Sequence, residues 1–236
     1  MRRLTRNEKL HFRSYAELRD SSRITVDFAD FGELGGELTG NESDVFDILP
    51  EWSGVILDPA LQECILHISR LGIRWRAEAS FCSFGGEFCV AELYGSLLAP
   101  PPDVAWTGSS EFERQLYSEL RVIDYAPRAG VDEFAAIRVQ DGVNPLEIWY
   151  YNPDLGAAGE RGVDCVKMSV SYCEYLDALR LTKGTFGWQY LYTDVLLRGD
   201  LFSDTVMNLQ AMLEVFPDIF PDHNYVSLEE RLAERL

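Results

Sequence analysis

Four short apolar segments, each separated from the next by turn-forming residues, constrain the fold of this chain most strongly. They span residues 121–125, 131–139, 146–151 and 163–167. Asp-Gly and Asn-Pro pairs fall between the second and third segments, and an Asn-Pro-Asp turn followed by three glycines separates the third from the fourth. These residues favour tight reversals of the backbone. The spacing therefore predicts an antiparallel meander of β-strands.

Helical and further strand patterns surround this meander. The preceding half predicts a loosely amphipathic helix at 4–20, a helix from Asp58 to Leu71 that ends at Gly72, and a helix at 109–120. It also predicts strands at 23–28, 73–79 and 87–94, the last two around a Phe84-Gly85-Gly86 turn. The following half predicts helices at 169–181, 185–197 and 203–216, and one that begins with a capping box of Ser227 and Glu230. This order favours an α+β fold, in which a single, mainly antiparallel twisted sheet is flanked by N- and C-terminal helices.

The charge is distributed unevenly along the first part of the chain. Residues 1–23 carry seven basic and three acidic side chains and form a basic arm, either mobile or docked. A strand follows, and then a glycine-rich loop. Between Asp27 and Glu51 lie eight carboxylates and no Lys or Arg. Such a run forms a solvated face or attracts a basic partner.

The overall composition excludes several classes of protein. A net charge of −18 argues against a protein that binds nucleic acid or an anionic membrane. No run of 18 apolar residues occurs that could span a bilayer. The basic start is followed by Asn7, Glu8 and Lys9 rather than by the apolar stretch of a secretory signal, so we expect a cytoplasmic protein.

The five cysteines are odd in number, and no two have Cys-x-x-Cys spacing. We therefore expect neither a disulfide framework nor a zinc site, but small buried thiols in a reducing compartment.

No sequence motif identifies a reaction that the protein could catalyse. The three histidines, His11, His67 and His223, lie far apart, and neither a Gly-x-Ser-x-Gly, a phosphate-loop nor a Gly-x-Gly-x-x-Gly pattern occurs. With 39 carboxylates, an acid–base pair cannot be selected without knowledge of burial. We expect a protein that is not an enzyme, with no catalytic residues, no cofactor and no metal, although an unfamiliar catalytic geometry stays open.

One region nevertheless resembles a known family. It comprises the Glu-Ile-Trp-Tyr-Tyr-Asn-Pro-Asp segment that begins at Glu147, the strand at 163–167, the Ser-Tyr-Cys-Glu-Tyr-Leu-Asp-Ala-Leu helix that begins at Ser171, and the Thr-Lys-Gly-Thr-Phe-Gly-Trp-Gln-Tyr-Leu segment that begins at Thr182. These segments resemble the SUKH superfamily, whose usual Asn-Gly-Gly is replaced here by Phe84-Gly85-Gly86. The resemblance implies one antiparallel sheet flanked by helices and no catalytic set. It does not reach residues 1–50, and so implies an N-terminal extension over residues 1–50 and a SUKH-like α+β domain over residues 51–236. It also implies an immunity protein that binds and neutralises a cognate toxin.

The acidic balance suits a basic toxin, for example a nuclease, because a nuclease must itself hold phosphates. The alternative is a regulatory or scaffold module that binds a cellular protein or peptide. As partner-binding candidates we take acidic residues of the first 50 and three residues of the resembling region, each of which also has a purely structural explanation in a solvated loop, a turn or the core: Asp27, Asp30, Glu33, Glu37, Asp44, Tyr151, Asp154 and Trp188.

Overall fold

The computed structural model describes residues 3–34, 55, 60–157 and 164–236. Its strands are β1 (Ile24–Phe31), β2 (Arg70–Glu78), β3 (Ser83–Ala91), β4 (Leu120–Tyr125), β5 (Phe134–Arg138), β6 (Glu147–Tyr151) and β7 (Cys165–Lys167). Its α-helices are α1 (Arg6–Asp20), α3 (Ala60–Cys64), α4 (Leu93–Leu98), α5 (Glu111–Glu119), α6 (Pro153–Ala157), α7 (Tyr172–Thr182), α8 (Ser203–Ile219) and α9 (Val226–Arg235). Two short 3₁₀ helices, η2 (Trp188–Tyr192) and η3 (Asp200–Phe202), precede α8.

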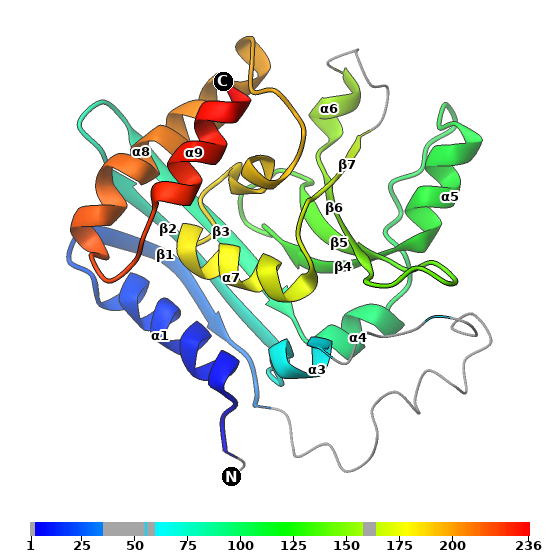
Figure 1. The fold of residues 1–236 in the computed structure, drawn as a ribbon, viewed down its shortest axis with the longest axis horizontal. Coiled ribbons are helices and arrows are strands. Elements are labelled where there is room, and N and C mark those ends of the chain that lie inside the picture. Colours follow the sequence, from blue (N-terminus) through cyan, green and yellow to red (C-terminus); the bar gives the residue numbers. More distant parts are fainter. Residues whose placement is uncertain (1–2, 35–54, 56–59, 158–163) are drawn as a thin grey trace.

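All seven strands form one sheet in which each strand pairs antiparallel with the next one along the chain. The meander predicted for residues 121–167 is confirmed, and it extends through β1–β3. The helices α1, α7, α8 and α9 flank the sheet (Figure 1). The predicted α+β class, with N- and C-terminal helices beside a single antiparallel sheet, is confirmed.

Both faces of the central strands are covered, as alternate residues of β5 show. Ala135 and Ile137 belong to the main core, which the sheet forms with α7, α8 and α9. Phe134 and Ala136 point to the opposite face and join a second, smaller core with Leu116 of α5. Because successive side chains of a strand point to opposite faces, the unbroken apolar run at 134–137 indicates that helices or loops cover both sides.

The basic N-terminal arm is a docked helix. Thr5 and Glu8 exchange hydrogen bonds with each other's backbone N–H in a capping box that starts α1. Further along the helix, Leu18 is fully buried in the main core. After this helix β1 pairs with β2 over most of its length. The described part of the predicted extension therefore shares its sheet and core with the following residues.

Two of the predicted elements around β2 and β3 are wrong. The helix expected from Asp58 to Leu71 ends at Cys64, and Leu71 and Gly72 lie within β2. Asp58 itself lies outside the described residues. Gly85 and Gly86 lie within β3 rather than at a turn, because each is in close contact with another backbone. A Cβ on Gly85 would lie 2.6 Å from the carbonyl oxygen of Trp75.

The C-terminal helices also depart from expectation in two places. Instead of a helix at 185–197 the chain forms only η2, because Gly184 and Gly187 adopt left-handed backbone angles, with φ of 69° and 82°. The capping box predicted at Ser227 is absent, since the N-cap of α9 is Tyr225, two residues earlier, and it makes no side-chain cap. The helices at 203–216 and 169–181 are confirmed with small shifts of their ends.

Cys64 and Cys173 form a disulfide that joins α3 to α7. The expectation of five free thiols is therefore wrong for this pair, which lies 109 residues apart in the sequence. The remaining three cysteines, Cys82, Cys89 and Cys165, are free, and the last two are buried as expected. In the described part of the chain no helix has the length and apolarity needed to cross a bilayer.

Candidate functional site

The sheet opens between β3 and β4, and this opening creates the candidate site. The two strands pair at one position only, where Val90 lies opposite Asp124. The rest of this edge of β3 pairs instead with residues 184–186, which follow α7. The backbone N–H of Glu87 donates to the carbonyl of Gly184 at 3.0 Å, and that of Phe186 donates to the carbonyl of Gly85 at 3.0 Å. A space lined by strands and by this loop therefore remains between β4 and residues 184–189.

Asp124 is held at the margin of this space by hydrogen bonds that replace strand pairing. Its Oδ1 accepts from the backbone N–H of Cys89 at 2.8 Å, and its Oδ2 accepts from the hydroxyl of Tyr175 at 2.7 Å. Burial raises the pKa of this carboxyl to about 6, although both hydrogen bonds favour its charged form. Asp124 can thus change its charge near neutral pH.

Glu87, on β3, is the second buried carboxyl. Its Oε1 accepts from the backbone N–H of Arg128 at 2.8 Å, and its Oε2 lies 3.9 Å from Nη1 of Arg74. Only 1% of this side chain is exposed. Burial raises the pKa of the Glu87 carboxyl, while the backbone donor and the neighbouring arginines oppose that shift.

Glu133, just before β5, is fixed by a network of neutral donors. Its Oε2 accepts from the hydroxyl of Tyr150 at 2.8 Å and its Oε1 from Nδ2 of Asn152 at 2.7 Å. The same amide nitrogen donates to the hydroxyl of Tyr190 at 2.9 Å. Burial is the main cause that raises the pKa of Glu133, and the charge of Asp154 adds to it.

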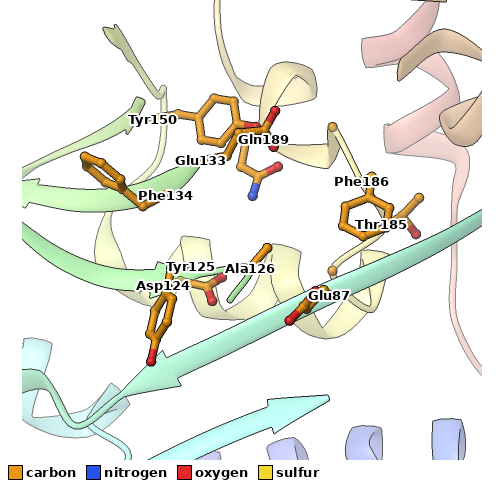
Figure 2. A pocket seen from close by; sticks show the side chains of 12 residues that line it. Glu87, Asp124, Tyr125, Ala126, Glu133, Phe134, Tyr150, Thr185, Phe186 and Gln189 are labelled. Carbon is orange, nitrogen blue, oxygen red and sulfur yellow. The ribbon is translucent and has the colours of Figure 1, made fainter. Parts of the chain in front are cut away.

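Glu133 lines three neighbouring hollows. The first, which we call the slot, also contains Asp124, Glu87 and Gln189 and has a volume of about 20 Å³ (Figure 2), enough for one water molecule. The second, the inner cavity, measures about 360 Å³ and lies between Glu133, Phe186 and the start of α8. The third, the outer groove, measures about 720 Å³ and follows the loop from Tyr125 to Phe134. The side chain of Glu133 thus lies where the slot, the inner cavity and the outer groove meet.

The lining of the inner cavity is acidic and partly apolar. Its carboxylates are Glu133, Asp154 and Asp204, and among the described residues Arg74 is the one cation that lines it. Its other lining residues are Ala129, Val131, Asn152, Phe186, Gly187, Tyr190, Leu201, Phe202, Thr205 and Asn208. The outer groove adds Asp103 and Asp132. These surfaces offer hydrogen-bond acceptors and negative charge to a cationic ligand.

Within the described ranges no group of three or more His, Cys, Asp or Glu side chains converges closely enough to hold a metal ion. The three carboxylates described above are instead occupied by hydroxyl, amide and backbone donors.

Two of the predicted partner-binding residues reach these hollows. Asp154 is exposed and lines the inner cavity. Tyr151 lines the outer groove, but it is only 7% exposed and stacks on Phe134, with 4.7 Å between the ring centroids. Trp188 is buried in the main core, packed against Tyr175, and therefore presents no surface to a partner.

The acidic candidates of the first 50 residues lie elsewhere. On β1, Asp27 pairs with Arg76 at 3.0 Å and Asp30 with Arg70 at 2.6 Å, so the charges of both carboxylates are compensated. Glu33 is exposed just after this strand, and its carbonyl accepts from the backbone N–H of Ser69. Glu37 and Asp44 lie outside the described residues. Of the described members of this group, Asp27, Asp30 and Glu33 do not line the inner cavity with Asp154.

The comparisons with known proteins give no relative. No family model, no curated protein and no solved structure matches this chain. The site must therefore be interpreted from its own geometry.

Proposed function

We propose that this chain is a non-catalytic binding protein that captures a basic protein partner at the surface formed by the inner cavity and the outer groove. One observation carries the proposal: Glu133, Asp154 and Asp204 line one cavity, and none of them has an ion pair within the described ranges. Their charge is available to a partner, unlike that of Asp27 and Asp30.

Exposed apolar side chains accompany this charge. Val131 is 42% exposed and Leu201 is 43% exposed, and both line the inner cavity. Protein interfaces combine such apolar contacts with polar margins, and opposite charge accelerates the encounter of the partners. The net charge of −18 extends the attraction beyond the site itself.

The resemblance to the SUKH superfamily suggests that the partner is a toxin domain and that the complex neutralises it by covering its active cleft. A regulatory or scaffold protein that binds a cellular partner is the alternative. Coexpression of the chain with a toxin domain encoded beside it tests this choice. Restored growth supports neutralisation, and binding without restored growth supports the alternative.

A cytoplasmic location is part of the same proposal. The disulfide between Cys64 and Cys173 argues against it, because such bonds persist mainly in oxidising compartments. Cell fractionation, with alkylation of thiols in the intact cell, decides between the two. Recovery in the cytoplasmic fraction with the pair reduced supports the proposed location, and recovery outside it with the pair oxidised contradicts it.

A further inference from the structure

The inner cavity has the size and walls of a site for a single inserted group rather than of a flat contact surface. Its volume of about 360 Å³ lies in the range of ligand pockets, roughly 300–1,000 Å³. Phe186, Phe202 and Leu201 form apolar walls, while Glu133 and Asn152 supply polar groups. Such a combination of apolar walls and few fixed polar groups selects a ligand by shape and by charge.

The polar groups of this cavity are organised before any ligand arrives. Asn152 is only 8% exposed, and its amide donates to Glu133 and Tyr190 while its Oδ1 accepts from the backbone N–H of Asp154. Glu133 is held from a second direction by the hydroxyl of Tyr150. Each oxygen of the Glu133 carboxylate receives one donor and can accept more, because a carboxylate offers about four lone-pair sites.

The one arginine in the lining does not neutralise these acids. Nη1 of Arg74 donates to the backbone carbonyl of Arg128 and lies 3.9 Å from Glu87, which belongs to the slot. Its charge is therefore partly compensated outside the inner cavity. Three carboxylates remain in the cavity without an ion pair in the described part of the chain.

We infer that the inner cavity accepts an arginine side chain of the basic partner, whose guanidinium binds Glu133 and a carboxylate of the rim while its flat face lies against the aromatic wall. This inference rests on the proposed function, and it names the group by which the partner is recognised. A guanidinium suits the site better than an ammonium, because it is planar, weakly hydrated, stacks on aromatic rings and presents several donors in a rigid fork.

The rim carboxylates, Asp154 and Asp204, can contact the guanidinium from two sides. Asp154 lies in the first turn of α6 and Asp204 in the first turn of α8, so the two carboxylates come from different elements. A planar guanidinium with five N–H donors can donate to carboxylates in more than one direction while its face lies on an aromatic ring. A compact ammonium has no flat face and cannot make both kinds of contact at once.

Titration of the full chain with three small amides tests the inference without any protein partner. The probes are N-acetyl-arginine amide, N-acetyl-lysine amide and N-acetyl-citrulline amide, which has nearly the shape of the arginine probe but no charge. Binding is followed by nuclear magnetic resonance shifts of the chain and is expected at roughly millimolar strength. We expect the arginine probe to bind at least tenfold more tightly than citrulline and more tightly than lysine.

Variants locate the bound group. Glu133→Gln retains an acceptor for Tyr150 and is expected to weaken the arginine probe at least tenfold, and Asp204→Asn, on the exposed rim, to weaken it less. Glu229→Gln on α9 removes the same charge outside the cavity and is expected to change nothing. Equal binding of arginine and citrulline, no saturable binding of arginine, or undiminished binding by Glu133→Gln each overturns the inference. The proposed function is tested separately, by the binding of the whole partner.

Discussion

The ammonium nitrogen of Lys183 lies 2.6 Å from Oε2 of Glu17, and this contact joins the end of α7 to the N-terminal helix α1. Lys183 is fully buried, and its nitrogen also donates to the hydroxyl of Ser14 at 2.8 Å. The same residue supplies the backbone carbonyl that accepts from the indole of Trp75. The basic N-terminal arm is therefore anchored beside the loop that lines the candidate site.

Replacement of Lys183 by Met is expected to destabilise the protein by about 2 kcal/mol, because it removes a charge-assisted hydrogen bond from Glu17, which Arg13 and His223 still contact. The estimate is at the lower end of the usual range because 19% of the Glu17 side chain remains exposed. Urea unfolding measures the loss. Arg13→Gln is the control, because Arg13 contacts the same carboxylate from a 64% exposed position. Equal losses in both variants would contradict this account.

The ionisation of Asp124 predicts a specific dependence of stability on pH. The pKa of this carboxyl is about 6 in the folded protein and near 3.8 when unfolded, so the folded state binds the proton more tightly. Its contribution to stability is therefore present at low pH and is lost as the pH rises from about 4 through 6. The full effect amounts to about 3 kcal/mol.

Comparison with Asp124→Asn isolates that contribution. The free energy of unfolding of the wild type, minus that of the variant, is expected to fall between pH 4 and pH 7, because Asn does not titrate. Urea unfolding of both proteins at several pH values provides the difference. A difference that stays constant, or that grows with pH, would show that Asp124 does not titrate as described.

The glycines of β3 predict a second local effect. A Cβ on Gly86 would lie 2.4 Å from the carbonyl oxygen of Gly184, so Gly86→Ala must displace residues 184–186 from the strand. We expect a loss of about 2 kcal/mol, as in other overpacked sites, and weaker binding at the inner cavity, which Phe186 lines. Gly72→Ala on β2 is the control, since its nearest contact would be an ordinary 3.4 Å. Equal effects of the two changes would contradict the assigned role of the close contact.

The disulfide is expected to protect Cys64 and Cys173 from alkylation in the oxidised, unfolded protein, so that three of the five cysteines react. Its removal by Cys64→Ser together with Cys173→Ser is expected to cost about 2–5 kcal/mol. Cys82→Ser, at a free and partly exposed thiol, serves as control and is expected to have little effect. Reaction of all five cysteines without a reductant would refute the bond.

The meander could be predicted from the sequence because its turns depend on local residues. The residues between β5 and β6 and those after β6 favour reversals of the backbone independently of the rest of the fold. The glycines of β3 could not be interpreted in this way. Gly86 is needed because residues 184–186, about a hundred positions later, approach its backbone. The left-handed angle of Gly184 belongs to the same long-range contact, and that of Gly187 interrupts the helix expected at 185–197.

The site was only partly predictable for a related reason. Asp154 was found because its turn stands out beside β6. Asp124 and Glu133 carry no local signal that separates them from the other 37 of the 39 acidic residues, because their surroundings and their hydrogen-bond partners depend on the whole sheet. The Cys64–Cys173 bond likewise depends on a contact between α3 and α7 across 109 residues.

The most direct test of the proposed function is the affinity for the purified basic partner, measured by calorimetry at low and high salt with the wild type and with a Glu133→Gln, Asp154→Asn, Asp204→Asn variant. The wild type is expected to bind tightly at low salt and to lose affinity as salt screens the charges. The variant is expected to bind at least tenfold more weakly at low salt and to respond less to salt. Equal affinities of the two proteins, unchanged by salt, would contradict capture by this acidic surface.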